Sequence, residues 1–338
     1  MNRRSAVAVA VAALLTGCGP DLRVTLVAKE PDQLFAAIWA SGAKDAWFGG
    51  NTNSTQTAVL VHFDGSSVSP VTLPGTLRTI SGLWGSGPGD VWAAGAAPAP
   101  TGAQTLAVLL HYDGASWSTA FTLPGFGNFF GVWGAAAGDV WAVGNGGATA
   151  DPSQWTGLLV HFDGTAWTSV PTPGLSIPGL RSICGRGPDD VWATGTAPIV
   201  NSGTYHWDGQ SWSEPSQTVH ARAFCSSDGL WLLRGESGAE LEFYDEQNAP
   251  RAVDTGGRSV HTVFATSTAD VWMAGSECAR QGLLGCEQTQ YVLAHSSGAA
   301  FTDVTLPSQL NTQEVDVIWG LGPQDVWFAG PFALLHHP

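Results

Sequence analysis

Charged side chains are scarce in this 338-residue chain, at 12% of the residues, and lysine occurs only as Lys29 and Lys44. The formal net charge is −15. Because a negative protein repels phosphate backbones, this balance argues against general nucleic-acid binding. Past the N-terminus no run of about eighteen apolar residues occurs, so the sequence predicts no later membrane-spanning helix.

Motifs of common enzymes are also missing. The sequence has no G-x-S-x-G nucleophile elbow,. Its closely spaced glycines, such as Gly85 and Gly87, fall between expected strands and open no helix, so they form no phosphate cradle. We therefore predict no cofactor and no catalytic residue.

The N-terminus carries an export signal. Two arginines precede an apolar run from Ala6 to Leu15, which is too short to span a bilayer,. The ending "LTGC" resembles the bacterial lipobox, and this resemblance implies cleavage before Cys18 and acylation of Cys18. The alternative is an ordinary signal peptide followed by a chance cysteine. Gly19, by resemblance to Gram-negative lipoproteins, favours sorting to the outer membrane, on its periplasmic or cell-surface side.

One phrase recurs through the rest of the chain. "GDVWAAG" at Gly89 returns as "GDVWAVG" at Gly138, and related phrases follow every 39 to 55 residues. The aligned tryptophans are Trp47, Trp92, Trp141, Trp192, Trp231, Trp272 and Trp327. Seven units of this period indicate a repeat architecture.

Each unit has the pattern of four short strands. In the second unit these are "TISGLWG", "VWAAG", "LAVLLHY" and "SWSTAF", separated by Gly/Pro/Asp turns,. We expect an all-β fold, a seven-bladed β-propeller of four-stranded antiparallel blades. The Asp of the phrase is expected to hydrogen-bond the turn backbone, and the Trp to pack between blades.

The repeats resemble those of secreted and lipid-anchored bacterial β-propellers with the pattern D-V-W-A-V-G followed by H-[FYW]-D-G-[ST]-x-W. The resemblance covers essentially all of the mature chain and implies the fold but no activity. The D-G-x-x-W hairpins are also distantly similar to the Asp-box of sialidase-type propellers, D-x-G-x-T-W, with a spacing one residue shorter.

The last unit contains only three strands. The segment Asp21 to Lys29 precedes the first unit and has no other partner, so we expect it to complete the last blade and close the ring,. This divides the chain into a signal peptide (1–17), a lipid-anchored tether (18–21) and one propeller (22–338). It also predicts that the face with the tight turns lies near the membrane.

Histidines recur once per unit, which spreads them around a ring and prevents convergence on one metal ion. We therefore predict no metal site and expect each to pair with a turn Asp or the backbone; the six are His62, His111, His161, His206, His295 and His336. The terminal pair His336 and His337 is expected in a disordered end, with loose metal binding by the pair as the alternative.

Four cysteines form two expected disulfides. Cys278 and Cys286 lie in one loop, and export favours their oxidation. Cys184 and Cys225 end the matching phrases "RSIC" and "RAFC" on adjacent inner strands, which predicts a bridge between two blades. The alternative for this second pair is two buried free thiols.

The entrance of the central channel is the candidate ligand site. The residues three before each aligned aromatic or Cys are Ala36, Ser81, Phe130, Arg181, Arg222, His261 and Asp316. Nearby polar residues are Arg78, His220, Arg258 and Glu314. Converging polar groups in a concavity with variable loops indicate a ligand site. The alternative is that these side chains only pair with one another.

Three function classes follow. The first is a lipid-anchored, non-enzymatic module that binds a protein or a glycan through its loop-rich face, attached to the membrane by its acyl group. The outer-membrane barrel-insertion machinery has a propeller component of this general kind. The alternative is a glycan-active, sialidase-like hydrolase, which requires a Tyr nucleophile near the channel. A structural spacer without a ligand is a third class.

Overall fold

The fold was analysed in a computed structural model that describes residues 22, 24–100, 104–171, 179–195, 203–235, 240–245, 250–282, 285–307 and 315–338. In these ranges the chain forms β-strands, with one short 3₁₀ helix, η1 (Pro152–Gln154). None of the described helices is long and apolar enough to span a membrane. Signal peptide 1–17, tether 18–21 and Cys18 lie outside the described residues.

The described strands form five four-stranded sheets and one six-stranded sheet, all antiparallel. The first sheet contains β5 (Thr79–Gly87), β6 (Asp90–Pro98), β7 (Thr105–Tyr112) and β8 (Trp117–Thr122). The second contains β9 (Phe126–Ala136), β10 (Asp139–Gly147), β11 (Thr156–Phe162) and β12 (Trp167–Ser169). The third contains β13 (Leu180–Gly187), β14 (Asp190–Gly195), β15 (Gly203–Trp207) and β16 (Trp212–Ser216). The fourth contains β17 (His220–Ser226), β18 (Gly229–Arg234), β19 (Glu240–Tyr244) and β20 (Arg251–Ala252).

The fifth sheet contains β21 (Ser259–Ser267), β22 (Asp270–Gly282), β23 (Gly285–Ser296) and β24 (Thr302–Asp303). The six-stranded sheet contains β25 (Val317–Gly322), β26 (Asp325–His337), β1 (Thr25–Gly42), β2 (Asp45–Thr52), β3 (Ala58–Phe63) and β4 (Val68–Pro70). The expected separate seventh sheet is not present as such, because β1 and β26 are long strands that join two strand sets into one sheet.

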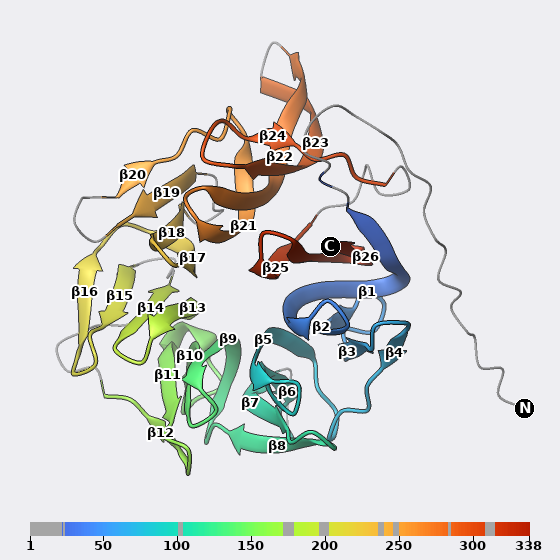
Figure 1. Cartoon of the computed structure of the whole chain (residues 1–338). Helices are drawn as coiled ribbons and strands as arrows, with labels where there is room; N and C mark the ends of the chain where they lie inside the picture. The colour runs from blue at the N-terminus through green and yellow to red at the C-terminus, as the bar shows by residue number, and fades with distance from the viewer. Residues whose placement is uncertain are drawn as a thin grey trace, which may run out of the picture.

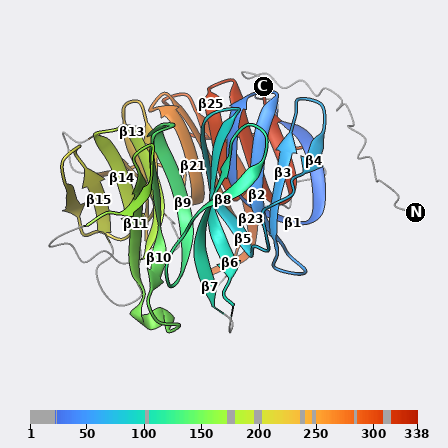
Figure 2. The same cartoon turned by 90° about the horizontal axis from the view of Figure 1, so that it is seen from below.

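The sheets are arranged radially around one axis (Figure 1). Their innermost strands contact each other in the order β1, β5, β9, β13, β17, β21 and β25, and β25 contacts β1 again. This closed arrangement is a β-propeller, so the expected all-β propeller of four-stranded antiparallel sheets is confirmed. Figure 2 shows the ring from the side.

The ring is closed by the two ends of the described chain. Residues Thr25 to Lys29 of β1 pair with Ala333 to His336 of β26, and the Thr25 hydroxyl donates to the His336 carbonyl at 3.0 Å. After a register shift, the remainder of β1 pairs with β2. The predicted pairing of the N-terminal segment with the last repeat is therefore confirmed from Thr25 onward.

The tryptophans of the repeated phrase are buried and pack between sheets, as expected. The Trp47 ring lies 5.4 Å from the ring of Trp117 in the next sheet, and Trp92 lies 5.2 Å from Trp167 in the same way. Each of these two tryptophans is at most 4% exposed. At both of these boundaries the repeat thus places a wide apolar ring between two sheets.

The aspartate of the phrase has a different partner from the one expected. Asp90 lies two residues before Trp92 and therefore on the same face of the strand. The cross-strand partner of Trp92 is His111, so the Asp90 carboxylate and the His111 imidazole meet diagonally at 2.6 Å,. The turn backbone is instead capped by the hairpin aspartates, of which Asp113 accepts from the backbone N–H groups of Ala115 and Ser116.

All six recurring histidines make this contact with the aspartate of their own unit, at 2.5 to 2.9 Å. Their predicted structural pairing is confirmed. The expectation of a disordered His336 and His337 is wrong: both lie in β26 and are buried, because His336 pairs with Thr25 of the N-terminal strand and the His337 ring packs 5.1 Å from the ring of Trp272.

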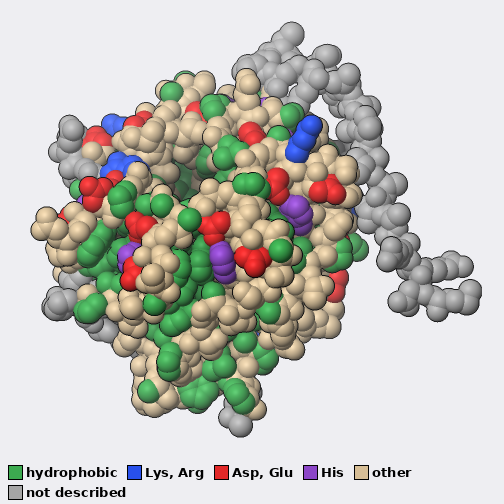
Figure 3. Space-filling model, turned by 60° about the horizontal axis from the view of Figure 1, so that its bottom comes forward, with side chains coloured by type: hydrophobic (Ala, Val, Ile, Leu, Met, Phe, Trp, Pro, Cys, Tyr) green, Lys and Arg blue, Asp and Glu red, His purple; other side chains and the backbone are tan. Residues whose placement is uncertain are grey.

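Two faces of the ring differ in their connections. Two-residue turns join first to second strands, as between Gly87 and Asp90, and we call this side the turn face. The connections from second to third strands, including η1, lie on the opposite side, which we call the loop face (Figure 2). Histidine side chains lie beside acidic ones on the surface drawn in Figure 3.

Candidate functional site

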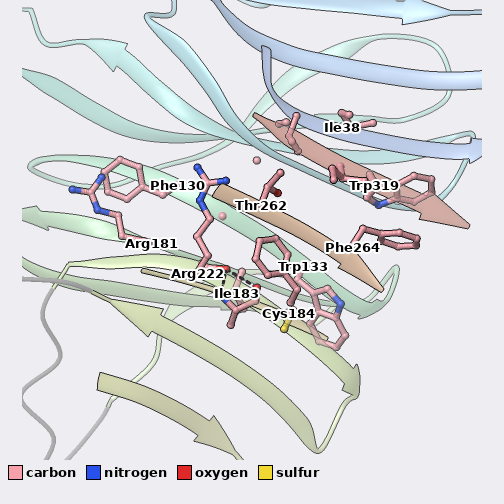
Figure 4. A pocket seen from close by; sticks show the side chains of 18 of the residues that line it. Ile38, Phe130, Trp133, Arg181, Ile183, Cys184, Arg222, Thr262, Phe264 and Trp319 are labelled. Atoms are coloured by element: carbon pink, nitrogen blue, oxygen red, sulfur yellow. Dashed lines mark hydrogen bonds between the residues drawn. The ribbon is translucent and has the colours of Figure 1, made fainter. Parts of the chain in front are cut away.

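A cavity of about 640 Å³ lies on the axis of the ring. All of the innermost strands contribute to its wall, with apolar side chains such as Leu83, Trp133 and Ile183. The described residues that line it include the charged side chains Arg181 and Arg222 (Figure 4). It is therefore the central channel whose entrance the sequence-predicted site residues were expected to surround.

Five of the seven predicted entrance positions coincide with β-bulges: Ala36, Ser81, Phe130, Arg181 and His261. In β5 the register shifts between Ile80 and Gly82, which leaves Ser81 as the extra residue. The equivalent extra residues of the other inner strands are Ala36, Phe130, Arg181, Ala221 and His261. A bulge re-aims the side chain that it carries, and this explains why these positions turn away from the regular strand faces.

The alignment is wrong by one residue in the fifth unit. Phe224 pairs with Trp231, only seven residues later, whereas Trp84 pairs with Trp92, eight residues later. The inner strands of the other units have a further bulge next to this turn, as between Gly85 and Gly87, and β17 lacks it, so that Ala221 rather than Arg222 occupies the bulge at the start of the strand. Arg222 nevertheless lines the cavity.

Arg181 and Phe130 form a stacked pair at one end of the cavity. The guanidinium carbon of Arg181 lies 4.4 Å from the centre of the Phe130 ring, across the boundary between β13 and β9 (Figure 4). Such a contact is attractive through the ring quadrupole. Arg181 is exposed and makes no ion pair with any residue that the structure describes.

Arg222 extends over the cavity from β17. Its Nη1 donates to the backbone carbonyl of Asp316 at 3.3 Å, so the side chain reaches from the fourth sheet to the segment before β25. Arg181, Phe130 and Arg222 lie at the beginnings of inner strands, which start on the loop face. We call this end of the cavity, defined by these three residues, the arginine mouth.

Other predicted site residues lie elsewhere. His220 is fully buried, with Nδ1 2.8 Å from the Thr204 hydroxyl and Nε2 3.1 Å from a Glu242 oxygen. Burial lowers the pKa of His220, and the neighbouring Glu242 only partly opposes this effect,. His220 is therefore a neutral structural link between sheets rather than a residue of the cavity.

Arg258 is used in ion pairs. It lies 3.2 Å from a Glu277 oxygen and 2.8 Å from an Asp303 oxygen, which ties β21 to β22 and β24. This is the mutual pairing that the sequence left open as an alternative. His261, Asp316 and Arg78 are not among the residues that line the cavity, and Glu314 lies outside the described residues.

Both predicted disulfides are confirmed. Cys184 in β13 is bonded to Cys225 in β17 within the wall of the cavity, and Cys278 is bonded to Cys286 across the β22–β23 hairpin. Disulfides of this kind indicate an oxidising compartment, extracellular or periplasmic.

One polar group of the site was not identified from the sequence. Thr262 lines the cavity from β21 and is fully buried, and its hydroxyl has no hydrogen-bond partner among the residues with described positions. The signal that was available is weak: Thr262 occupies the position of the small residues Gly82 and Gly131 in other units.

The described part of the chain holds neither a cluster of metal ligands nor a tyrosine at the cavity. No cluster of three or more His, Cys, Asp or Glu side chains there can hold a metal ion. The four tyrosines, Tyr112, Tyr205, Tyr244 and Tyr291, are all described, and none lines the cavity. The Tyr nucleophile that a sialidase-like hydrolase requires is therefore not placed there.

Comparison with known proteins gives similarity in structure alone. No protein-family model and no curated protein matches the chain. A solved structure of YCF48 bound to D1 peptide is 16% identical, with 93% of this chain and 96% of that chain covered and a TM-score of 0.65. The likeness shows the β-propeller fold.

Two further structures extend this comparison. A streptogramin B lyase is 13% identical over 93% of this chain and 96% of that chain, with a TM-score of 0.61. A GH74 xyloglucanase from Xanthomonas campestris is 12% identical over 92% of this chain and 53% of that chain, with a TM-score of 0.65. Because YCF48, a lyase and a xyloglucanase all have this fold, the fold alone does not specify a function,.

Proposed function

We propose that this protein is an exported, lipid-anchored β-propeller that binds a partner protein at the arginine mouth on its loop face. The observation that carries the proposal is the placement of Arg181, stacked on Phe130, beside Arg222 at one end of the axial cavity. In a chain with a net charge of −15, such a local positive site favours a partner with exposed carboxylates,.

The proposed architecture has seven blades. The six-stranded sheet divides within β1: Thr25 to Lys29 pair with β26, the strand pairs with β2 from Gln33 onward, and Leu34 lies between Pro331 of β26 and Asn51 of β2. On one side β2, β3, β4 and the second part of β1 make one four-stranded blade. On the other side, β25, the two halves of β26 and the first part of β1 make the seventh.

The proposed anchor uses Cys18. Thr25, at the start of β1 and seven residues after Cys18 in the sequence, lies beside His336, which contacts Asp325 at the turn face. Acylation of Cys18 therefore orients the turn face toward the membrane and the loop face away from it. Metabolic labelling with a radioactive fatty acid tests this step, with Cys18→Ser as the variant that must lose the label.

A partner protein suits the loop face for two reasons. The ring is rigid, because it is closed by strand pairing and carries a disulfide in its inner wall, whereas its surface connections differ from unit to unit,. In addition, the structurally similar YCF48 was solved with a bound peptide, which supports peptide recognition by a propeller of this shape.

Affinity capture from a cell-envelope fraction, quantified by mass spectrometry, tests the proposal. We expect the double variant Arg181→Ala with Arg222→Ala to lose the captured partner. The matched control is Arg234→Ala with Arg251→Ala, which removes two exposed arginines outside the cavity. Equal capture by the parent chain, the double variant and the control would refute protein binding at the arginine mouth.

A further inference from the structure

We propose that one sector of the turn face rests on the lipid bilayer, with Leu321 as the side chain that enters the headgroup region. We call it the contact sector and define it by four exposed residues, Leu321, Pro323, Ser297 and Pro338. The inference rests on the proposed anchoring at Cys18 and deepens it, because it states which part of the ring meets the lipid.

Leu321 is the most exposed large apolar side chain among the described residues. It is 54% exposed, and the next, Tyr291, is 41% exposed. A single exposed leucine is ordinary on a protein surface, so its place in the repeat decides its meaning. Leu321 is the extra residue of the bulge between Gly320 and Gly322, beside the turn that leads to β26.

In four other units the residue at this bulge is a hydrogen-bond donor to the aspartate of the repeat. The Ser86 hydroxyl donates to Asp90 at 2.5 Å. The same contact is made in their own units by Ser41, Arg186 and Thr266. Leu321 cannot donate, so Asp325 receives no hydrogen bond from this position. The leucine therefore removes a bond from the fold and adds little to the core, which points to a contact outside the chain.

The charge of the turn face also differs around the ring. The hairpin between third and fourth strands begins with an aspartate in the first five units, at Asp64, Asp113, Asp163, Asp208 and Asp245. The first four of these accept hydrogen bonds from hydroxyl and backbone N–H groups of their own turns, which hold the pKa of each carboxyl below its ordinary value,. The same position is Ser297 in the sixth unit and Pro338 in the last. Because pressing a carboxylate against a bilayer removes its hydration, the contact sector can approach lipid more closely than the other units.

The contact sector adjoins the start of the N-terminal strand. At the turn face, Leu321 on β25 is followed across the sheet by Asp325 and His336 of β26. Thr25 of β1 comes next, three strand spacings or about 14 Å from β25,. Thr25 follows Cys18 by seven residues, which span at most about 25 Å,. An acyl group at Cys18 therefore holds this side of the ring at the bilayer.

The two contacts have different roles. The acyl group supplies the affinity for the membrane, because one leucine buries too little apolar surface to bind by itself. The contact at Leu321 adds a second point of attachment, and two points fix the tilt of the ring where one would leave it free to turn.

The test places a fluorophore at the leucine. Leu321→Cys is labelled with a thiol-reactive NBD dye, and the lipidated full chain is reconstituted into phosphatidylcholine vesicles. We expect the emission to shift to shorter wavelength and to be quenched by a nitroxide lipid. The matched control is Ala135→Cys, because Ala135 is the equivalent exposed bulge residue of the third unit, on the far side of the ring. Its emission is expected to remain that of a dye in water.

A second measurement separates a lipid contact from a structural role. Leu321→Ser restores a donor for Asp325, so we expect an equal or higher melting temperature. Ser86→Leu makes the opposite change in the second unit and is expected to lower the melting temperature. Neither variant is expected to change the flotation of the protein with vesicles.

The outcomes distinguish this inference from the proposed anchor. Water-like emission at Leu321 in a protein that floats with the vesicles would overturn the inference and leave the anchor intact. Equal shifts at Leu321 and Ala135, or a lower melting temperature for Leu321→Ser, would overturn it as well. If the parent chain floats no better than Cys18→Ser, the anchor itself fails, and the contact fails with it.

Discussion

The indole edge of Trp133 in β9 lies directly against Gly185 in β13, where an added Cβ atom would stand 2.5 Å from Cη2. The same relationship links Trp39 to Gly85 and Trp84 to Gly134 at successive sheet boundaries. At these boundaries, neighbouring innermost strands therefore pack through the edge of a tryptophan ring on one strand against a glycine on the next. Where β13 meets β17, the disulfide between Cys184 and Cys225 replaces this contact.

The first prediction concerns this contact. Gly185→Ala inserts a methyl group into space that the Trp133 ring occupies, so we expect a loss of about 1 to 3 kcal/mol in the free energy of unfolding. The control is Gly187→Ala in the same strand, where the nearest atom to an added Cβ is an Asp189 oxygen at 3.4 Å. Urea unfolding of both variants measures the difference, and equal stabilities would contradict the packing role of Gly185.

The second prediction compares the two disulfides. The bond between Cys184 and Cys225 spans 41 residues and that between Cys278 and Cys286 spans 8. On chain-entropy grounds we expect Ala replacement of the first pair to cost about 4 kcal/mol and of the second about 2.5 kcal/mol. Chemical denaturation under non-reducing conditions provides the values. A larger cost for the hairpin pair would show that loop entropy does not govern their contributions.

The third prediction concerns acid. Burial alone would raise the pKa of Asp190, but hydrogen bonds from His206 and Arg186 outweigh it and lower the pKa to about 2. Because this value lies below the ordinary 3.8, the carboxylate stabilises the fold above about pH 4, and this contribution is lost as the pH falls toward 2,.

Asp190→Asn is therefore expected to lower the free energy of unfolding by about 2 kcal/mol at neutral pH, with the difference from the parent chain vanishing near pH 2. Thermal unfolding over this pH range measures the effect. Asp189→Asn, at the exposed neighbouring carboxylate, is the control and should show little change. A difference for Asp190→Asn that is the same at every pH would exclude an electrostatic origin.

The fourth prediction tests ring closure. Ala28 of β1 is 5% exposed and packs with Trp327 and Leu334, whereas the adjacent Lys29 is exposed. We expect Ala28→Asp to destabilise the protein by about 2 to 4 kcal/mol, because it buries a charge in the seam between the chain ends. Lys29→Asp introduces the same side chain on the outer side and is expected to have a small effect. Similar melting temperatures for both variants would contradict the seam.

The sequence was most informative where the repeats constrain the chain. The disulfide of Cys184 and Cys225 and the pairing of Thr25 to Lys29 with the last repeat could be predicted, because each follows from the order of strands around a ring. The six histidine pairs were predictable for the same reason. Strand order and repeat period are properties of the pattern alone.

The site was less predictable because it depends on single residues. Because β17 lacks the bulge that the other inner strands have next to the turn, Ala221 occupies the position at which Arg222 was expected. His220 and Arg258 were expected at the channel, yet strand pleating turns them to Glu242 and Glu277. Side-chain direction changes with every one-residue step of register, and the repeat pattern does not report such steps.

The seam between Thr25 and His336 joins residues 311 positions apart, so it brings together the earliest and the latest parts of the described chain to be synthesised. Contacts of such high sequence separation form slowly, because a long stretch of chain must be organised first. The N-terminal strand is therefore expected to have no pairing partner until the intervening sheets have assembled and β26 is in place. Completion of the circle is expected to be the final step of folding, and until then the exposed edge of β26 is the part of the molecule most open to capture by a chaperone or by another copy.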